Sequence, residues 1–165
     1  MLTGLPPLVS GSTQLLILGS FPGAASLAAQ QYYGHPQNHF WKILQAIWPI
    51  GAINTGTSSY QIRSEWLLSK RLGLWDVYAA CEREGSLDSN IRKQVVNDFG
   101  DVQRLCPRLQ AIAHNGGESF KHACHTQLPG LPVYRLPSTS PANASWSFER
   151  KLAAWREVFE KHGLV

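Results

Sequence analysis

The sequence predicts an α/β fold with three layers, α/β/α, around a central four-stranded parallel sheet. Short apolar runs alternate with segments in which apolar residues recur at helical spacing, which is the pattern of strands joined by helical crossovers. The first run, residues 14–20, is apolar without alternation, as expected of a strand covered on both faces. The 165 residues suffice for one domain with a substantial core and are few for two.

Four strands are predicted, at residues 14–20, 72–80, 109–117 and 131–138. Each is a short apolar run, and the first and third end in glycine-containing turns. Because helical segments separate them, the strands are expected to pair in parallel.

Five helices are predicted, at residues 39–48, 59–73, 101–109, 118–126 and from about 145 onward. In the first, apolar residues recur at helical spacing and Pro49 stops the helix. Gly73 is expected to end the second and Pro107 to break the third. The last helix carries one apolar stripe, which consists of Phe148, Leu152, Trp155 and Phe159.

Composition narrows the functional classes. Hydrophobic residues make up 44% and charged residues 16% of the chain, which indicates a globular protein. The formal charge of +4 permits a polyanionic partner without requiring one. No apolar run reaches the roughly 18 residues of a membrane span, and the N-terminus lacks the features of a signal peptide. A cytoplasmic protein without membrane contact is therefore expected.

The three cysteines are Cys81, Cys106 and Cys124. Their odd number and wide spacing predict reduced, buried thiols. The His-Ala-Cys-His segment at 122–125 superficially suggests a metal site, but no second ligand pair accompanies it, so no metal is expected.

The functional site is predicted at the carboxyl ends of the strands, where ligands bind in open α/β sheets. Four loops lie there: residues 19–23, 76–90, 114–117 and 136–145. They carry the unusual polar and glycine-rich stretches of the chain, which supports this location without naming a ligand.

The first loop, Gly-Ser-Phe-Pro-Gly at 19–23, lets a ligand approach the backbone closely. It matches neither the dinucleotide fingerprint nor a P-loop, and an ordinary tight turn remains an equal interpretation. In the segment 31–38 one tyrosine is expected in the core and the other in the pocket, where stacking on a nucleobase contributes about 1–3 kcal/mol. Asn38 either caps the following helix or faces the pocket.

The segment Leu-Pro-Ser-Thr-Ser-Pro-Ala-Asn-Ala at 136–144 is rich in hydroxyl groups. Hydroxyls and loop N–H groups are good phosphate ligands. An ordinary capped connection between a strand and a helix is the alternative.

Taken together and in this order, these stretches resemble the uracil-DNA glycosylase superfamily, nearest to its hypoxanthine-DNA glycosylase branch. The motifs are GSFPG, QYYGHPQNHFW, LWDV, GSLDSNI, HNG and LPSTSPANA. The resemblance spans roughly residues 15–160 and implies a single DNA glycosylase domain over residues 1–165. Its implied activity is removal of deaminated bases, hypoxanthine and also uracil, from single- or double-stranded DNA by a cofactor-free, metal-free monomer that acts at the nucleoid.

The resemblance also implies roles for individual residues. Asn38 and Asn115 are the expected catalytic residues: Asn38 orients the attacking water, because Ser20 and Phe21 stand where most members carry an Asp or Asn, and the Asn115 amide contacts the base edge. The expected base-binding residues are Ser20, Phe21, Pro22, Gly23, Tyr33, His35 and Asp76. The expected DNA-binding residues are Ser138, Thr139, Ser140, Pro141 and Asn143.

Some alternatives remain open at this level. Asp76 either steadies the developing sugar cation or ties down its loop at Asn90. The absence of lysine from these loops predicts a monofunctional enzyme without strand cleavage. A non-catalytic module that binds nucleic acid or a nucleotide, a mismatch-specific uracil/thymine glycosylase and a small-molecule nucleoside hydrolase are the competing readings.

Overall fold

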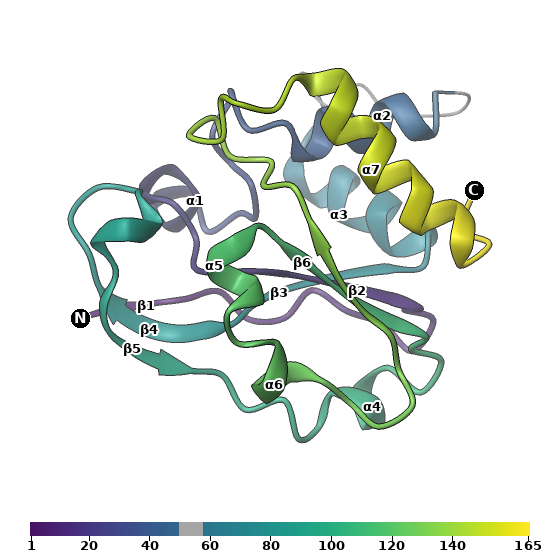
Figure 1. The fold of residues 1–165 in the computed structure, drawn as a ribbon, viewed down its shortest axis with the longest axis horizontal. Helices are drawn as coiled ribbons and strands as arrows, with labels where there is room; N and C mark the ends of the chain where they lie inside the picture. The colour runs from purple at the N-terminus through teal and green to yellow at the C-terminus, as the bar shows by residue number, and fades with distance from the viewer. Residues whose placement is uncertain (50–57) are drawn as a thin grey trace.

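The computed structural model describes residues 1–49 and 58–165, and within them it contains the predicted parallel sheet (Figure 1). The sheet has four strands in the order β3-β2-β6-β7, and all three neighbouring pairs are parallel. The strands are β2 (Leu15–Gly19), β3 (Leu72–Asp76), β6 (Ala111–Asn115) and β7 (Val133–Leu136). The predicted α/β class and central sheet are confirmed.

Three helices cover one face of this sheet: α2 (Phe40–Ile47), α3 (Tyr60–Ser69) and α7 (Phe148–Lys161). Leu15 and Ile17 of β2 form one core cluster on this face with Phe40 of α2 and Trp155 of α7. The helix α7 begins where the Ser147 hydroxyl accepts the Arg150 N–H, which satisfies one of the unpaired donors of its first turn.

The opposite face takes the alternate residues of the same strands, because successive side chains of a strand point to opposite sides. Leu16, Leu18 and Ile112 pack there against α4 (Val102–Leu105) and the first residues of β4 (Tyr78–Glu82). The single-turn helices α5 (Gly117–Phe120) and α6 (Ala123–Thr126) lie on this side too. The helix α1 (Ala24–Ala29) follows the first loop.

A second sheet was not predicted. It is antiparallel, with the order β1-β4-β5, and consists of β1 (Leu2–Thr3), β4 (Tyr78–Glu82) and β5 (Arg92–Val96). The prediction of one strand over 72–80 is therefore wrong. The chain leaves the parallel sheet at Val77, whose N–H donates to the Gly19 carbonyl, and then pairs with new neighbours. A short 3₁₀ helix, η1 (Asp88–Asn90), lies between β4 and β5.

Several predicted boundaries also need correction. The helix predicted to end at Gly73 ends at Ser69, and Arg71 makes the turn with φ 64°. The helix predicted over 118–126 is divided into α5 and α6. The helix near Pro107 is only α4, and the last helix begins at Phe148 rather than near residue 145.

Cys81 and Cys106 are free and buried as expected, whereas Cys124 is free and exposed, so the expectation of a buried thiol is wrong there. Across residues 1–49 and 58–165, no group of three or more His, Cys, Asp or Glu side chains is arranged to hold a metal ion. None of the helices in the same residues is long and apolar enough to cross a membrane.

Candidate active site

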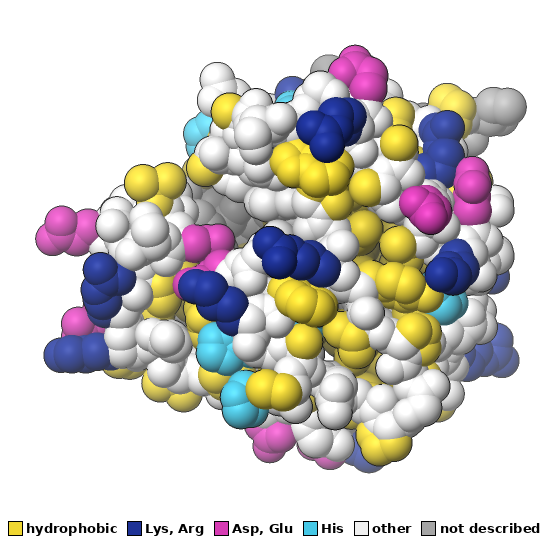
Figure 2. All heavy atoms as spheres, viewed as in Figure 1, with side chains coloured by type: hydrophobic (Ala, Val, Ile, Leu, Met, Phe, Trp, Pro, Cys, Tyr) yellow, Lys and Arg dark blue, Asp and Glu magenta, His cyan; other side chains and the backbone are white. Residues whose placement is uncertain are grey.

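Strand register brings four loop-facing residues to one edge of the sheet. Gly19 is paired with Asp76, and Asn115 is paired with Leu136. All four line a cleft of about 1180 Å³, which exceeds the roughly 300–1,000 Å³ of ordinary small-ligand pockets. Figure 2 shows a hollow on this face of the molecule, with Lys and Arg side chains beside it.

The first wall of the cleft is the 19–23 loop, which is fastened to the 83–90 loop by three hydrogen bonds. The Ser20 hydroxyl donates to Asp88 Oδ1 at 2.7 Å, and Arg83 Nη2 donates to the Pro22 carbonyl at 2.6 Å. The Ala24 N–H donates to Ser86 Oγ at 2.9 Å, next to Gly23 at the start of α1. The two loops therefore form one unit.

Phe21 fills the space beneath this unit. Its ring is 6% exposed and lies under the Arg83 guanidinium, whose carbon is 5.4 Å from the ring centroid. Phe21 lines the cleft together with Ser20, Pro22 and Gly23, so the four residues predicted from the first loop are all at the cleft.

The two adjacent tyrosines have different surroundings, as expected. Tyr32 borders the cleft as well but is buried in the core, where its hydroxyl donates to the Pro6 carbonyl at 2.6 Å. Tyr33 is half-buried at the cleft, and its ring stacks on Phe40 with 4.2 Å between centroids. Tyr33 has a φ of 53°, a conformation that costs a bulky residue free energy and persists only when the surroundings impose it.

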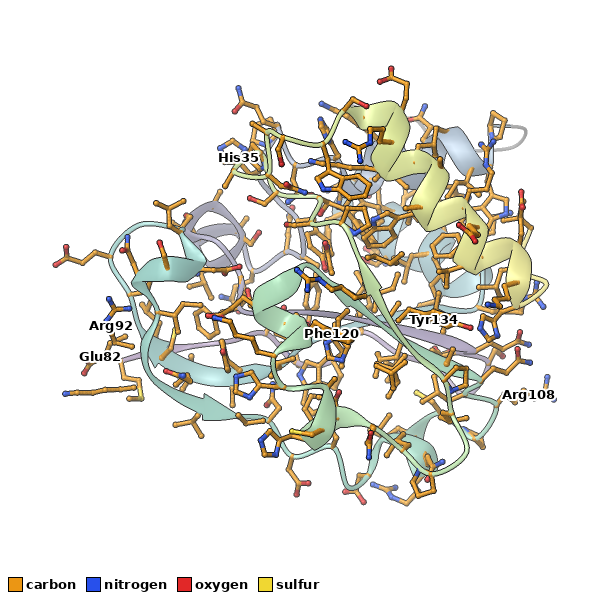
Figure 3. The ribbon with its side chains drawn as sticks, viewed as in Figure 1. His35, Glu82, Arg92, Arg108, Phe120 and Tyr134 are labelled. Carbon is orange, nitrogen blue, oxygen red and sulfur yellow. The ribbon has the colours of Figure 1, made fainter. Side chains whose placement is uncertain are left out.

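Asn38 both lines the cleft and organises the start of α2. Its Oδ1 accepts the Phe40 N–H at 2.9 Å, although His39 occupies the N-cap position itself. This bond fixes which end of the amide is oxygen. In the described part of the chain no hydrogen bond uses Nδ2, which is therefore available to a ligand. His35 stands at the outer edge of this segment, exposed, with Nδ1 accepting the Gln37 N–H (Figure 3).

Asn115 joins three parts of the site. Its Nδ2 donates to the Tyr33 hydroxyl at 3.1 Å and to Thr139 Oγ1 at 3.0 Å, and its Oδ1 accepts the Thr139 N–H at 3.0 Å. Both amide hydrogens are used, so only a lone pair of Oδ1 remains for a base. Thr139 is fully buried and faces Asn115 rather than solvent.

The rest of the 136–144 segment forms the opposite wall. Ser138 Oγ accepts the Ser140 N–H at 3.2 Å, and Asn143 Nδ2 donates to the Ser138 carbonyl at 3.1 Å. These bonds curl the segment so that Pro141 is exposed at its tip. Beneath it the Lys151 amine, 1% exposed, contacts the Ser140 carbonyl and His39 Nδ1.

Asp76 lies at the bottom of the cleft and is 5% exposed. Burial and the nearby Asp88 carboxylate raise the pKa of Asp76 to about 7. Asn90 Nδ2 contacts the Glu84 carbonyl instead of Asp76. The suggestion that Asp76 ties its loop to Asn90 is therefore wrong. The hydrogen bond from Ser20 to Asp88 holds this loop instead.

Among the cleft-lining residues that sequence reasoning missed are Asp88, Arg135 and Trp146, and Arg83 supports the first loop from behind. Asp88 is the partner of Ser20, and desolvation in the cleft raises the pKa of its carboxyl. Trp146 carries the Arg150 guanidinium over its ring at 4.2 Å. The acidic residue could have been noticed within the GSLDSN motif, but nothing in the sequence distinguishes Trp146 from a core tryptophan.

Comparison with known proteins agrees with this architecture. Residues 6–159 match the family model of the uracil DNA glycosylase superfamily. A hypoxanthine DNA glycosylase from Methanosarcina barkeri is 37% identical over 158 residues, which cover 96% of this chain and 98% of that protein. Its counterpart from Methanosarcina acetivorans is 37% identical over 156 residues, 94% of this chain and 96% of that one. A solution NMR structure from Methanosarcina acetivorans, provisionally described as a uracil DNA glycosylase, superposes with a TM-score of 0.83, with 37% identity and 95% of each chain covered.

Proposed function

Because the chain belongs to the uracil DNA glycosylase superfamily and is a DNA glycosylase, a hydrolase of N-glycosyl bonds, we propose that it releases hypoxanthine from deoxyinosine in DNA. Two relatives that match nearly its whole length are named hypoxanthine DNA glycosylase. The observation that carries the proposal is Asn38, which lines the cleft: its Oδ1 is held by the Phe40 N–H, and its Nδ2 has no hydrogen-bond partner among the described residues.

The reaction begins with extrusion of the base from the duplex, which costs a few kcal/mol and least for a deaminated or mispaired base. The exposed tip at Pro141, with Ser138, Ser140 and Asn143 behind it, holds the backbone beside the vacated position. Thr139 supports this segment from within, because its side chain and N–H are bound to Asn115.

The extruded base enters between the first loop and the tyrosine arm. Tyr33 presents a ring already stacked on Phe40, and base stacking on such a ring contributes about 1–3 kcal/mol. Ser20 and the backbone of 20–23 face the same space. Two rigid walls then hold the base before chemistry starts, which lowers the entropic part of the barrier.

Water attacks C1′ as the glycosidic bond breaks. An amide has no pKa near neutrality, so Asn38 orients the water: Nδ2 donates to its oxygen, and the second lone pair of Oδ1 accepts one of its hydrogens. The residues that line the described cleft include no lysine, so no Schiff base forms and the enzyme is monofunctional, without strand cleavage. We also propose that the enzyme acts as a monomer in the cytoplasm, at the nucleoid, where its DNA substrate lies.

The test is product release from oligonucleotides that carry deoxyinosine, deoxyuridine, deoxyxanthosine or mismatched thymidine. We expect hypoxanthine release to be fastest, with uracil release slower. Asn38→Ser keeps a side-chain oxygen for the Phe40 N–H and removes the amide. Loss of one preorganised donor is expected to lower the rate by about 10²–10³.

Gln37→Ala, on the exposed neighbour of Asn38, is the matched control and should retain activity. If Asn38→Ser folds normally and releases hypoxanthine at the wild-type rate, Asn38 only organises the helix and the proposed mechanism is wrong. If wild-type protein releases none of the four bases, the proposed substrate class is wrong.

A further inference from the structure

Asp76 is the cleft residue whose surroundings are least explained by the fold. It is 5% exposed, and its Oδ2 is buried without a hydrogen-bond partner in the part of the chain that the structure describes. A buried polar oxygen without a partner is costly and calls for an explanation. Because the residue also lines the cleft, a bound base is the group that can supply the missing partner.

The backbone beside Asp76 is built to admit this side chain. A Cβ on Gly19 would lie 2.6 Å from Asp76 Oδ1 and 3.4 Å from the Tyr33 hydroxyl oxygen. The carboxyl and the hydroxyl thus converge on one point at the end of β2, and only glycine leaves that point free. Asp76 lines the cleft from the end of β3, and Asn38 lines it from the segment just before α2.

Within residues 1–49 and 58–165, no Lys, Arg or His side chain forms an ion pair with this carboxyl. Arg83 is near enough to act on it electrostatically, but its Nε and Nη2 donate to the carbonyls of Gly85 and Pro22, and within residues 1–49 and 58–165 it forms no ion pair. The other charged or titratable groups that face Asp76 are Asp88 and the hydroxyls of Tyr32 and Tyr33. Burial and a like charge both favour the protonated acid, and the pKa of Asp76 is about 7.

We propose that Asp76 is a second catalytic residue, which acts as the general acid that donates its proton to the departing purine. The inference rests on the proposed function and adds the identity of the proton donor. Asp76 O–H gives its proton to a ring nitrogen of hypoxanthine as the C1′–N9 bond breaks and its electron pair goes to the base. The base leaves neutral, water adds its oxygen to C1′, and the proton lost from that water restores the Asp76 carboxylic acid through solvent.

This role fits a purine leaving group. Hypoxanthine leaves poorly as an anion, and a positioned proton donor contributes about 10²–10⁴ in rate. The neutral acid carries the proton that this step requires. A carboxylate would offer acceptors only.

The test is the pH dependence of single-turnover hypoxanthine release between pH 5.5 and 8.5, with saturating protein. The rate of wild-type protein is expected to fall by up to about tenfold per pH unit once Asp76 ionises. Asp76→Asn, which keeps the shape, should lower the rate by about 10²–10⁴ and abolish that alkaline fall. Binding of the same oligonucleotide, measured by fluorescence anisotropy, should change little.

A second variant leaves Asp76 in place. Asp88→Asn removes the negative charge that holds the proton on Asp76, while keeping an oxygen for the Ser20 hydroxyl. The midpoint of the alkaline fall should move to lower pH. Asp101→Asn, at an exposed site, is the control and should match wild type in rate and midpoint.

Three results separate the possibilities. A wild-type rate that is flat across this range overturns the inference and leaves the proposed function standing. An Asp76→Asn protein within threefold of wild type, with the same alkaline fall, does so as well. A wild-type protein that releases no hypoxanthine at any pH contradicts the proposed function itself, and the inference fails with it.

Discussion

The hydrogen bonds of Asn115 are expected to contribute measurably to the free energy of unfolding. Asn115→Ala removes the two donated bonds and the accepted bond that join β6 to Tyr33 and Thr139. Each such bond contributes about 0.5–1.5 kcal/mol net, so the free energy of unfolding should fall by about 3 kcal/mol. For a chain of this length about 2–4 °C is lost per kcal/mol, which corresponds to a Tm lower by roughly 9 °C.

Partial variants apportion this loss. Thr139→Val removes one hydroxyl and keeps the N–H that donates to Asn115, and Tyr33→Phe removes the other hydroxyl acceptor. Each should cost about 1 kcal/mol, or a Tm lower by roughly 3 °C. Asn90→Ala, in which only a 3.5 Å contact of an exposed amide is lost, is the control and should stay within about 0.5 kcal/mol of wild type.

The measurement is urea unfolding of each variant at one pH, followed by tryptophan fluorescence, with thermal unfolding alongside. An Asn115→Ala protein whose Tm lies within 2 °C of wild type would refute the reasoning, and so would one that loses no more than Thr139→Val. In either case the Asn115 amide would contribute little to the stability of the loops that it joins.

Four other outcomes are expected. Gly19→Ala should lower kcat/KM for hypoxanthine release by at least about tenfold, because its methyl group would lie 2.6 Å from Asp76 Oδ1 and overpacking costs about 1–3 kcal/mol. The control Gly11→Ala, which has open space around it, should match wild type. Tyr33→Ala should lower activity by about 5–150-fold through lost stacking, and unchanged activity would make the ring structural. Burial lowers the pKa of His114 to about 4, so as the pH falls the unfolded chain binds a proton before the folded protein does. The free energy of unfolding should therefore decrease from pH 6.5 toward pH 4 by at most about 1.4 kcal/mol per pH unit. Urea midpoints at several pH values measure this slope, which His114→Gln should reduce. Borohydride added during turnover should trap no protein–DNA adduct, and a trapped adduct would contradict the water mechanism.

The sequence predicted the parallel sheet because its strands are buried on both faces. Leu15–Gly19 carries no polar side chain, and Ala111–Asn115 is apolar over its first three residues, a pattern typical of a strand covered on both faces. The same property hid the break at Val77. Both β3 and the start of β4 are buried, so apolar character continues through the point where the chain changes sheets. Only the hydrogen bonds of Val77 and Tyr78 to the first loop reveal it.

The location of the site could be predicted from the sequence, but the side-chain hydrogen bonds within it could not. Strand ends that follow a parallel pattern meet at one edge, so Gly19, Asp76 and Asn115 could be grouped from the sequence. The engagement of both Asn115 hydrogens and the complete burial of Thr139 depend on how two distant loops approach each other. No local pattern encodes that approach, which is why Thr139 was expected to face the DNA.

The junction at Thr139 has a thermodynamic consequence. Asn115 bonds reach Tyr33 across 82 residues and Thr139 across 24, and the His39 N–H donates to the Thr139 carbonyl. Unfolding of any one of these three segments breaks the junction, so the proposed binding of DNA at the cleft requires all three to be folded. Deoxyinosine-containing DNA at a hundred times its dissociation constant should then raise the free energy of unfolding by about 2.7 kcal/mol. Amide hydrogens far from the cleft that exchange only by global unfolding should exchange more slowly, along with those near it.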